Sequence, residues 1–170
     1  MNTAVKTKLS FLYKLSYSSA SIGLNILAIT ISTWLLYFYS PPPDSGRMVY
    51  LPIGVVGGIM TFISLWDAVI DPFIGHWSDN LRSKLGRRKP FIIFSLPFIV
   101  GAMMLLWAPP NASTWLVAGF LLLVMLVYST AYSLAGIPYD ATMAELASDN
   151  NERISLSSWK SVFGILGVMV

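Results

Sequence analysis

Residues 66–90 read WDAVIDPFIGHWSDNLRSKLGRRKP, and this stretch decides how the rest of the chain is organised. Its first part holds two carboxylates, Asp67 and Asp71, inside an apolar segment. Its second part is a polar loop that carries five basic residues, namely Arg82, Lys84, Arg87, Arg88 and Lys89. Acids within an apolar segment and cations just beyond its end indicate a helix that crosses a membrane and ends at a basic loop.

The composition points to the same environment. Hydrophobic residues make up 55% of the 170 residues and charged residues only 11%, and the mean hydropathy is +0.66. A soluble domain carries about 25% charged residues, so this chain has too few to cover a surface that faces water. The net charge of +3 does not indicate nucleic-acid binding, because the basic residues cluster in loops. The absence of cysteine excludes disulfides and thiolate metal sites.

Apolar runs of about 20 residues are long enough to cross the hydrocarbon core. We therefore expect an all-α polytopic membrane protein with an N-terminal segment at residues 1–14 and spans at about 15–39, 49–77, 91–108 and 113–146. A fifth apolar run, at 155–170, would be roughly 22 Å long and too short to cross. We expect from this a truncated chain, and the alternative is a natural four-span protein with a re-entrant tail.

The distribution of basic residues predicts the orientation. Three lysines, at positions 6, 8 and 14, lie in the N-terminal segment, and the loop at 82–89 holds five basic residues. The loop before the second span has only Arg47, and the loop before the fourth span has none. Because short cytoplasmic loops carry an excess of Lys and Arg, we expect a cytoplasmic N-terminus, basic loop and 149–153 loop.

Asp67 and Asp71 are four residues apart and so share one helix face. Asp67 lies roughly 18 Å from Asp79 at the cytoplasmic end of the span, which places it near mid-membrane. A carboxylate at that depth is unfavourable by at least ~2.5 kcal/mol, so it is expected to face a cavity. Two adjacent carboxylates either share a proton or hold a cation between them, which predicts a coupling site for H⁺ or Na⁺. Alternatively, Asp71 caps a helix break at Pro72 or pairs with a basic residue elsewhere.

Five further residues are candidates for lining a solute cavity: Asn25, Tyr17, Trp66, Tyr132 and Lys160. Asn25 is polar near the middle of the first span and either lines a cavity or bonds a neighbouring helix. The aromatic side chains could stack on sugar rings, although aromatic residues in spans more often serve packing or interface anchoring. Lys160 either snorkels to the cytoplasmic surface or points inward to an acid or a solute.

A second group of candidates surrounds the basic loop and predicts a cytoplasmic gate: Gly75, Asp79, Gly86, Arg87, Arg88 and Glu145. Asp79 at a helix end can pair with loop arginines and hold neighbouring helices in one state of a rocking transporter. The alternative is that the basic loop only sets topology. For Asp140 and Glu145, the favoured interpretation is an interfacial ion pair with the basic loop.

An enzyme is not expected. Aspartyl proteases of the membrane oppose two aspartates from different helices, whereas both acids here lie on one helix. The sequence has no phosphate loop, metal-ligand cluster or nucleophile constellation, so no cofactor is predicted besides the coupling ion.

The stretch at 66–92 resembles the glycoside–pentoside–hexuronide:cation symporters, the melibiose permease-like branch of the major facilitator superfamily. Residues 13–17 (YKLSY) resemble the opening of that family. Residues 136–145, 152–153 and 158–164 resemble its signature from the fourth span to the fifth. The resemblance covers nearly the whole chain.

The resemblance implies twelve spans in two six-helix halves around a central site, with this chain as most of the N-terminal half. It implies cation-coupled symport of a sugar or glycoside in the bacterial plasma membrane, with the bilayer, the solute and the missing C-terminal half as partners. Asp67 and Asp71 match the acids of the second span that form the family's cation site. Asn25 and Gly136 stand where melibiose permeases have acids, and Lys160 stands where arginine is usual.

These departures leave the ion and the solute open. Ile70 also replaces a polar residue between the two aspartates, and with fewer acids H⁺ becomes more plausible than Na⁺. The alternatives to sugar symport are a major facilitator transporter for a non-sugar solute, such as a lipid-like one, and a truncated membrane protein that acts as a scaffold or sensor without transport.

Overall fold

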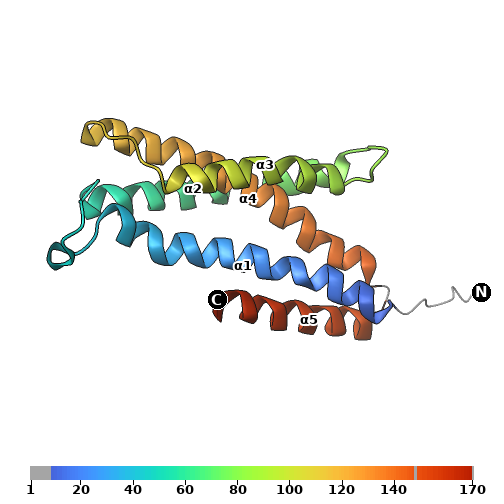
Figure 1. The fold of residues 1–170 in the computed structure, drawn as a ribbon. Coiled ribbons are helices and arrows are strands. Elements are labelled where there is room, and N and C mark those ends of the chain that lie inside the picture. The colour runs from blue at the N-terminus through green and yellow to red at the C-terminus, as the bar shows by residue number, and fades with distance from the viewer. Residues whose placement is uncertain (1–8, 148, 170) are drawn as a thin grey trace, which may run out of the picture. The chain divides into compact units, whose positions relative to one another are not determined.

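The computed structural model describes residues 9–147 and 149–169, and this part of the chain contains helices and loops but no strand. Its α-helices are α1 (Phe11–Tyr39), α2 (Ile53–Asn80), α3 (Lys89–Leu106), α4 (Thr114–Leu146) and α5 (Asn150–Met169), with a short 3₁₀ helix, η1 (Pro43–Ser45), after α1 (Figure 1). The predicted all-α fold is confirmed. Lys6 and Lys8 of the predicted N-terminal segment, together with Ser148 and Val170, lie outside the described residues.

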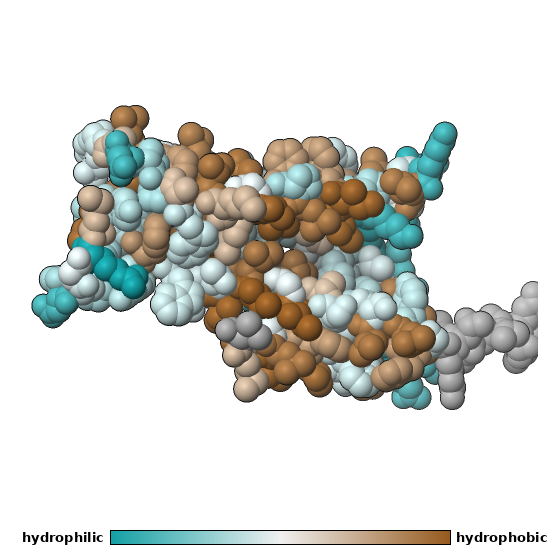
Figure 2. Space-filling model, in the orientation of Figure 1, coloured by the Kyte–Doolittle hydropathy of each residue, from teal (hydrophilic) through white to brown (hydrophobic). Residues whose placement is uncertain are grey.

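The helices α1, α2, α3 and α4 are each long and apolar enough to cross a membrane. The helix α5 is not among these candidate spans, and it carries the charged residues Glu152, Arg153 and Lys160. Figure 2 shows hydrophobic residues along the flanks of the helices and hydrophilic residues toward their ends. Large apolar side chains such as Leu65, Phe73 and Trp115 are exposed, which suits a surface that faces lipid.

Three helices begin four or five residues away from the starts that the apolar pattern suggests. The helix α1 begins at Phe11, where the Ser10 hydroxyl accepts the backbone N–H of Tyr13 at 3.2 Å. The helix α2 begins only at Ile53, because Pro52 before it is extended, with φ −58° and ψ 142°. The helix α5 begins at Asn150, five residues before the expected start, and has the acidic Glu152 in its first turn, which the helix dipole favours.

The chain forms two compact units. We call Met1–Ser32 with Asp140–Val170 the terminal unit, and Thr33–Tyr139 the central unit. The helices α1 and α4 each contribute one part to either unit.

In the terminal unit, α1 and α5 lie side by side and run parallel (Figure 1). Near their N-terminal ends, Lys14 Nζ lies 2.8 Å from Glu152 Oε2 and donates to the Ser155 hydroxyl at 3.1 Å. Farther along, a Cβ atom placed on Gly167 would lie 2.7 Å from the carbonyl oxygen of Ile22. The two backbones therefore approach so closely at Gly167 that no side chain fits there.

In the central unit, Tyr39 joins the ends of three elements. Its side chain is buried, and its hydroxyl donates to the carbonyl oxygen of Leu106, at the end of α3, over 2.8 Å. Its own carbonyl oxygen accepts the backbone N–H groups of Tyr50 and Leu51, each at 3.0 Å. These bonds fix the loop that leads into α2 and so help to set the position of that helix.

Candidate functional site

The helices α2 and α4 contact each other in the central unit through two hydrogen bonds from consecutive residues. The indole N–H of Trp66 donates to the Thr130 hydroxyl at 3.0 Å. The hydroxyl of Ser129, which is buried, donates to the carboxylate of Asp67. A carboxylate within a span is thus held by a hydroxyl of a neighbouring helix, which reduces the penalty for its burial.

The same two helices keep a constant register. Asp67 and Ser129 are 62 residues apart. Gly75 faces Ile137, which is also 62 residues farther along the chain (137 − 75), and a Cβ placed on Gly75 would lie 3.8 Å from it. The helices α2 and α4 therefore run parallel, and the register puts Asp71 level with Ser133, which is buried on α4.

Asp71 differs from Asp67 in its surroundings. Its Oδ1 atom is buried and has no hydrogen-bond partner among the described residues. The helix α2 continues through Pro72 as far as Asn80, so the alternative in which Asp71 caps a helix break at Pro72 is wrong. Pro72 is accommodated because lost backbone bonds within a span can be compensated by neighbouring helices.

This arrangement offers two carboxylates one helical turn apart with a serine hydroxyl beside one of them. The described residues contain no group of three or more His, Cys, Asp or Glu side chains that could hold a metal ion. The groups available at this place are the two carboxylates and neutral oxygen atoms. Such groups can accept a proton or act as ligands of a hard cation.

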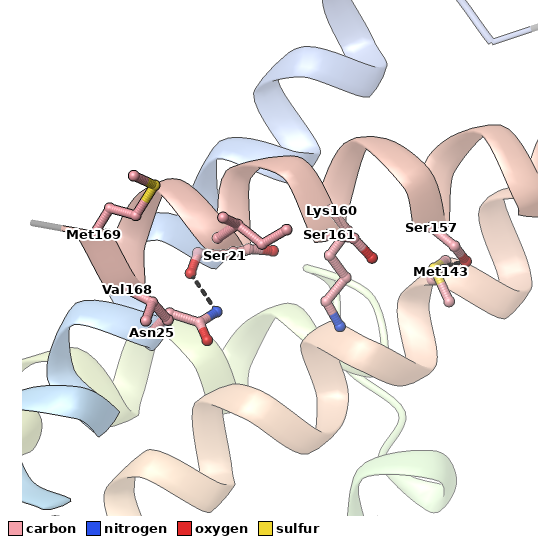
Figure 3. Close-up of a pocket in the computed structure, with 10 residues that line it drawn as sticks. Ser21, Asn25, Met143, Ser157, Lys160, Ser161, Val168 and Met169 are labelled. Atoms are coloured by element: carbon pink, nitrogen blue, oxygen red, sulfur yellow. Dashed lines mark hydrogen bonds between the residues drawn. The ribbon is translucent and has the colours of Figure 1, made fainter.

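A cavity of about 600 Å³ lies in the terminal unit, mainly along α1 and α5 (Figure 3). Its polar lining comes from Ser21, Asn25, Ser157, Lys160 and Ser161, and its apolar lining includes methionine and valine side chains. The side-chain amide of Asn25 donates to the backbone oxygen of Ser21 at 2.8 Å. The volume falls within the range of pockets that hold small organic ligands.

Lys160 points from α5 into this cavity (Figure 3). Its ammonium group forms an ion pair with Asp140 of α4. Of the two predicted orientations of Lys160, the structure has the one in which it points to an acid. The partner of Asp140 expected from the sequence was a basic-loop residue, and this expectation is corrected to Lys160. The two residues meet because α4 and α5 are consecutive antiparallel helices, which brings positions 20 residues apart to the same level.

The aromatic candidates do not line this cavity. Tyr17 is half-buried on α1 in the terminal unit, and Tyr132 is half-buried on α4 in the central unit. The ring of Tyr132 stacks on Tyr128, with 6.0 Å between centroids. The indole N–H of Trp66 donates to Thr130, and the role of the three aromatic side chains toward a solute stays a prediction.

The basic loop has a defined geometry. Arg88 Nη2 donates to Asp79 Oδ1 at 2.8 Å. The loop turns between Ser83 and Gly86, where each residue's carbonyl oxygen accepts a hydrogen bond from the other residue. Gly86 has a φ of 96°, a conformation that side chains other than glycine's rarely adopt. Arg87 is exposed in the central unit, and Glu145 is exposed at the end of α4 in the terminal unit. The gate that these residues would form stays a prediction.

The sequence reasoning missed Ser129 and Thr130. A single serine or threonine within an apolar span does not indicate a functional site. Such residues are common in spans, and their hydroxyls can donate to a backbone carbonyl oxygen of their own helix. A weak signal does exist, since Ser129 and Ser133 have the same four-residue spacing as Asp67 and Asp71. Because residues with equal spacing on two parallel helices can lie side by side, this match could have suggested that Ser129 pairs with Asp67.

Comparison with known proteins places the chain in a class. A sequence profile of the family described as MFS/sugar transport protein matches residues 16–170. The match covers most of the chain, which therefore belongs to this family of membrane transporters and not to a family of enzymes. Together with the four apolar helices, this makes it an integral, multi-pass membrane protein and confirms the resemblance seen in the sequence.

The similar proteins include transporters with different solutes in their names. The chain is 29% identical to the uncharacterized symporter YnaJ of Bacillus subtilis over 96% of its own length and 34% of that protein's. It is 26% identical to an isoprimeverose transporter of Lactiplantibacillus pentosus, over 92% and 32% of the two chains. It is 27% identical to the mouse sodium-dependent lysophosphatidylcholine symporter 1, over 97% and 31%. The chain spans about a third of the length of these relatives.

Proposed function

We propose that the chain is the N-terminal part of a secondary active transporter that couples the symport of a sugar or glycoside to a cation gradient. The observation that carries the proposal is the pair of carboxylates on α2, one bonded to Ser129 and the other with a buried, unpartnered oxygen. Such a pair within a span is unfavourable unless something positive joins it. The coupling ion, H⁺ or Na⁺, is that positive partner, and no further cofactor is proposed.

The chemistry of coupling follows from electrostatics. Without a cation, the negative charges of Asp67 and Asp71 repel each other across one helical turn. A proton or Na⁺ on the pair removes this repulsion within α2 and lowers the cost of keeping the two acids beside α4. Ser129 fixes one carboxylate oxygen, so the unpartnered oxygen of Asp71 is the side from which the ion is accepted. Occupancy of the site then biases the transporter between its two access states.

The solute is assigned to the cavity of the terminal unit. Asn25 and three serines supply hydrogen-bonding groups of the kind that hold hydroxyl-rich molecules, and Lys160 supplies a cation. The family description and the isoprimeverose transporter among the relatives support a sugar or glycoside. The chain is proposed to lie in the bacterial plasma membrane, with its N-terminus and basic loop in the cytoplasm and with the loop pair Asp79–Arg88 at the gate.

A second candidate solute is a lysolipid. Its support is the similarity to lysophosphatidylcholine symporters and the mixed lining of the cavity, where Met143, Val168 and Met169 stand beside the polar groups. A polar head group and an acyl chain would each find a matching part of such a lining.

The experiment uses the full gene product in energised membrane vesicles. Uptake of labelled glycosides and of lysophosphatidylcholine is measured with a Na⁺ gradient, a proton gradient or neither. The proteins compared are the wild type, Asp67→Asn and the control Asp44→Asn, whose acid is exposed in η1. We expect accumulation with one gradient, reduced to equilibration in Asp67→Asn and intact in the control. Accumulation that survives Asp67→Asn would move the coupling site elsewhere.

A further inference from the structure

The segment that joins α2 to α3 concentrates positive charge at a helix N-terminus. Residues 79–89, which include the loop and the adjoining helix ends, hold five basic residues and one acid, Asp79. The first turn of α3 contains no acidic residue, and its N-terminus has no side-chain capping bond. The N-terminal end of a helix is already positive, so cations there add to the field of the dipole instead of opposing it. By contrast, the first turn of α5 contains Glu152. The α2–α3 loop therefore attracts an anion.

Two exposed apolar side chains place this loop at the membrane surface. Trp77 near the end of α2 is 61% exposed, and Leu85 in the middle of the basic loop is 60% exposed. Tryptophan is enriched where the bilayer meets water. A leucine among cations also suits that boundary, where its side chain reaches acyl chains while the cations stay among the headgroups. The anionic groups that a membrane offers at this level are the phosphates of lipid headgroups.

An apolar groove of about 370 Å³ lies in the same unit, between α3 and α4. Phe94 and Phe98 of α3 form one wall, and Val127 and Leu134 of α4 form part of the other. Phe94 lies five residues after Lys89, which is roughly 8 Å along the helix. The groove therefore starts just inside the membrane from the basic loop. The Thr130 hydroxyl in its lining is bonded to Trp66, so the groove presents an apolar surface that suits an acyl chain.

We propose that this face binds one anionic phospholipid, with its phosphate at the basic loop and an acyl chain in the α3–α4 groove. Charge selects the headgroup, because Lys84 and Lys89 are exposed and cations near an anionic surface contribute about fivefold each to binding. The groove selects a lipid over a free phosphate, because a soluble phosphate has nothing to place against Phe94 and Phe98. The site does not depend on which solute or ion the transporter uses.

The test measures lipid retention by native mass spectrometry. The purified gene product is equilibrated with equal amounts of dioleoylphosphatidylglycerol and dioleoylphosphatidylcholine, and the bound lipids are counted. Lys84→Gln/Lys89→Gln is compared with Arg47→Gln/Arg153→Gln, which removes the same charge from exposed positions elsewhere. We expect the preference for phosphatidylglycerol to fall about tenfold or more in the first variant and to stay unchanged in the second. Equal loss in both variants, or no loss in the first, would overturn the headgroup site.

The groove is tested separately. Phe94→Ala/Phe98→Ala removes one wall, and Phe62→Ala/Phe73→Ala removes two exposed phenylalanines of α2 as the control. We expect a several-fold loss of retained lipid only in the α3 variant. Retention that is unchanged in that variant would overturn the acyl-chain half of the proposal. Displacement of the lipid by an equal concentration of glycerol phosphate would show instead a site for soluble phosphates and would also overturn it.

Discussion

The α1–α5 pair of the terminal unit and the α2–α4 pair of the central unit are both parallel helix pairs, but different chemistry joins them. In the first pair, the backbones touch at Gly167 and an ion pair closes the N-terminal ends. In the second pair, side chains of Trp66 and Asp67 bond to hydroxyls of the partner helix. The first contact depends on the absence of a side chain, and the second depends on particular polar atoms.

The two kinds of contact suit different functions. A contact between two closely packed backbones is rigid, because the helices cannot move apart without loss of packing. A contact made through a carboxylate responds to protons and cations, because occupancy changes the charge that the partner helix meets. We therefore assign stability to the first pair and ion response to the second, and the following substitutions test that division.

The largest effect is expected for Gly167→Leu. Its Cβ would lie 2.7 Å from the carbonyl oxygen of Ile22, and backbone cannot move aside as a flexible side chain can. Because the two helices must separate, we expect a loss of about 3 kcal/mol or more in stability, measured by thermal unfolding in detergent. Gly23→Leu on α1 is the control, since its Cβ meets nothing within 4 Å. Equal destabilisation by both variants would contradict the close approach of α1 and α5.

The next effect concerns Lys14 and Glu152. Their side chains are only 13% and 15% exposed, so removal of one partner leaves the other charge in a poorly solvated place. We expect Lys14→Met to lower the stability by about 2 kcal/mol. The double variant Lys14→Met/Glu152→Met is expected to recover much of this loss, since no unpaired charge remains. Additive losses in a double-mutant cycle would show that the two groups do not interact.

Ser129→Ala is expected to alter ion dependence as well as stability. The change removes the hydroxyl that holds one oxygen of Asp67, and a hydrogen bond to a charged group contributes about 1.5–3 kcal/mol. We expect the cation concentration for half-maximal uptake to change about tenfold. Thr130→Val breaks the neighbouring bond from Trp66 and leaves Asp67 untouched, so it serves as the matched control. A change of the same size in Thr130→Val would mean that any loosening of the two helices suffices.

The smallest effect is expected for Asp79→Asn. Asp79 is 56% exposed, although its partner Arg88 is only 13% exposed. Because solvent screens the charge of the exposed carboxylate, the contribution to stability is about 0.2–1 kcal/mol. If the loop is a gate, transport rate in the full gene product changes while the melting temperature shifts little. A rate equal to that of wild type would remove Asp79 from the gate.

The sequence predicts most of the fold because the bilayer constrains it. Apolar runs and the proline-rich and basic loops between them specify the helices, since few other structures satisfy the backbone within lipid. The ends are less predictable, because they depend on local contacts such as Ser10 before α1 and Glu152 in α5. An apolar pattern contains no information about these contacts.

The candidate site could be predicted only in part. Asp67 and Asp71 stand out because a carboxylate within a span is rare. Ser129 and Thr130 do not stand out, and their role appears only once the register of α2 and α4 is known. The ion pair between Lys160 and Asp140 could not be predicted either. A lysine at the membrane edge can extend to the surface or point inward to an acid, and only the packing of the helices decides between these two orientations.

The bond between Trp66 and Thr130 has a consequence for spectroscopy. Indole emission depends on what its N–H contacts, so separation of α2 from α4 changes the spectrum of this ring. The chain has 6 tryptophans, and a variant with the other five replaced by phenylalanine would emit from Trp66 alone. Binding of a cation to the neighbouring acid pair would then shift the emission maximum of Trp66. Ion binding could be followed in this way without an attached dye.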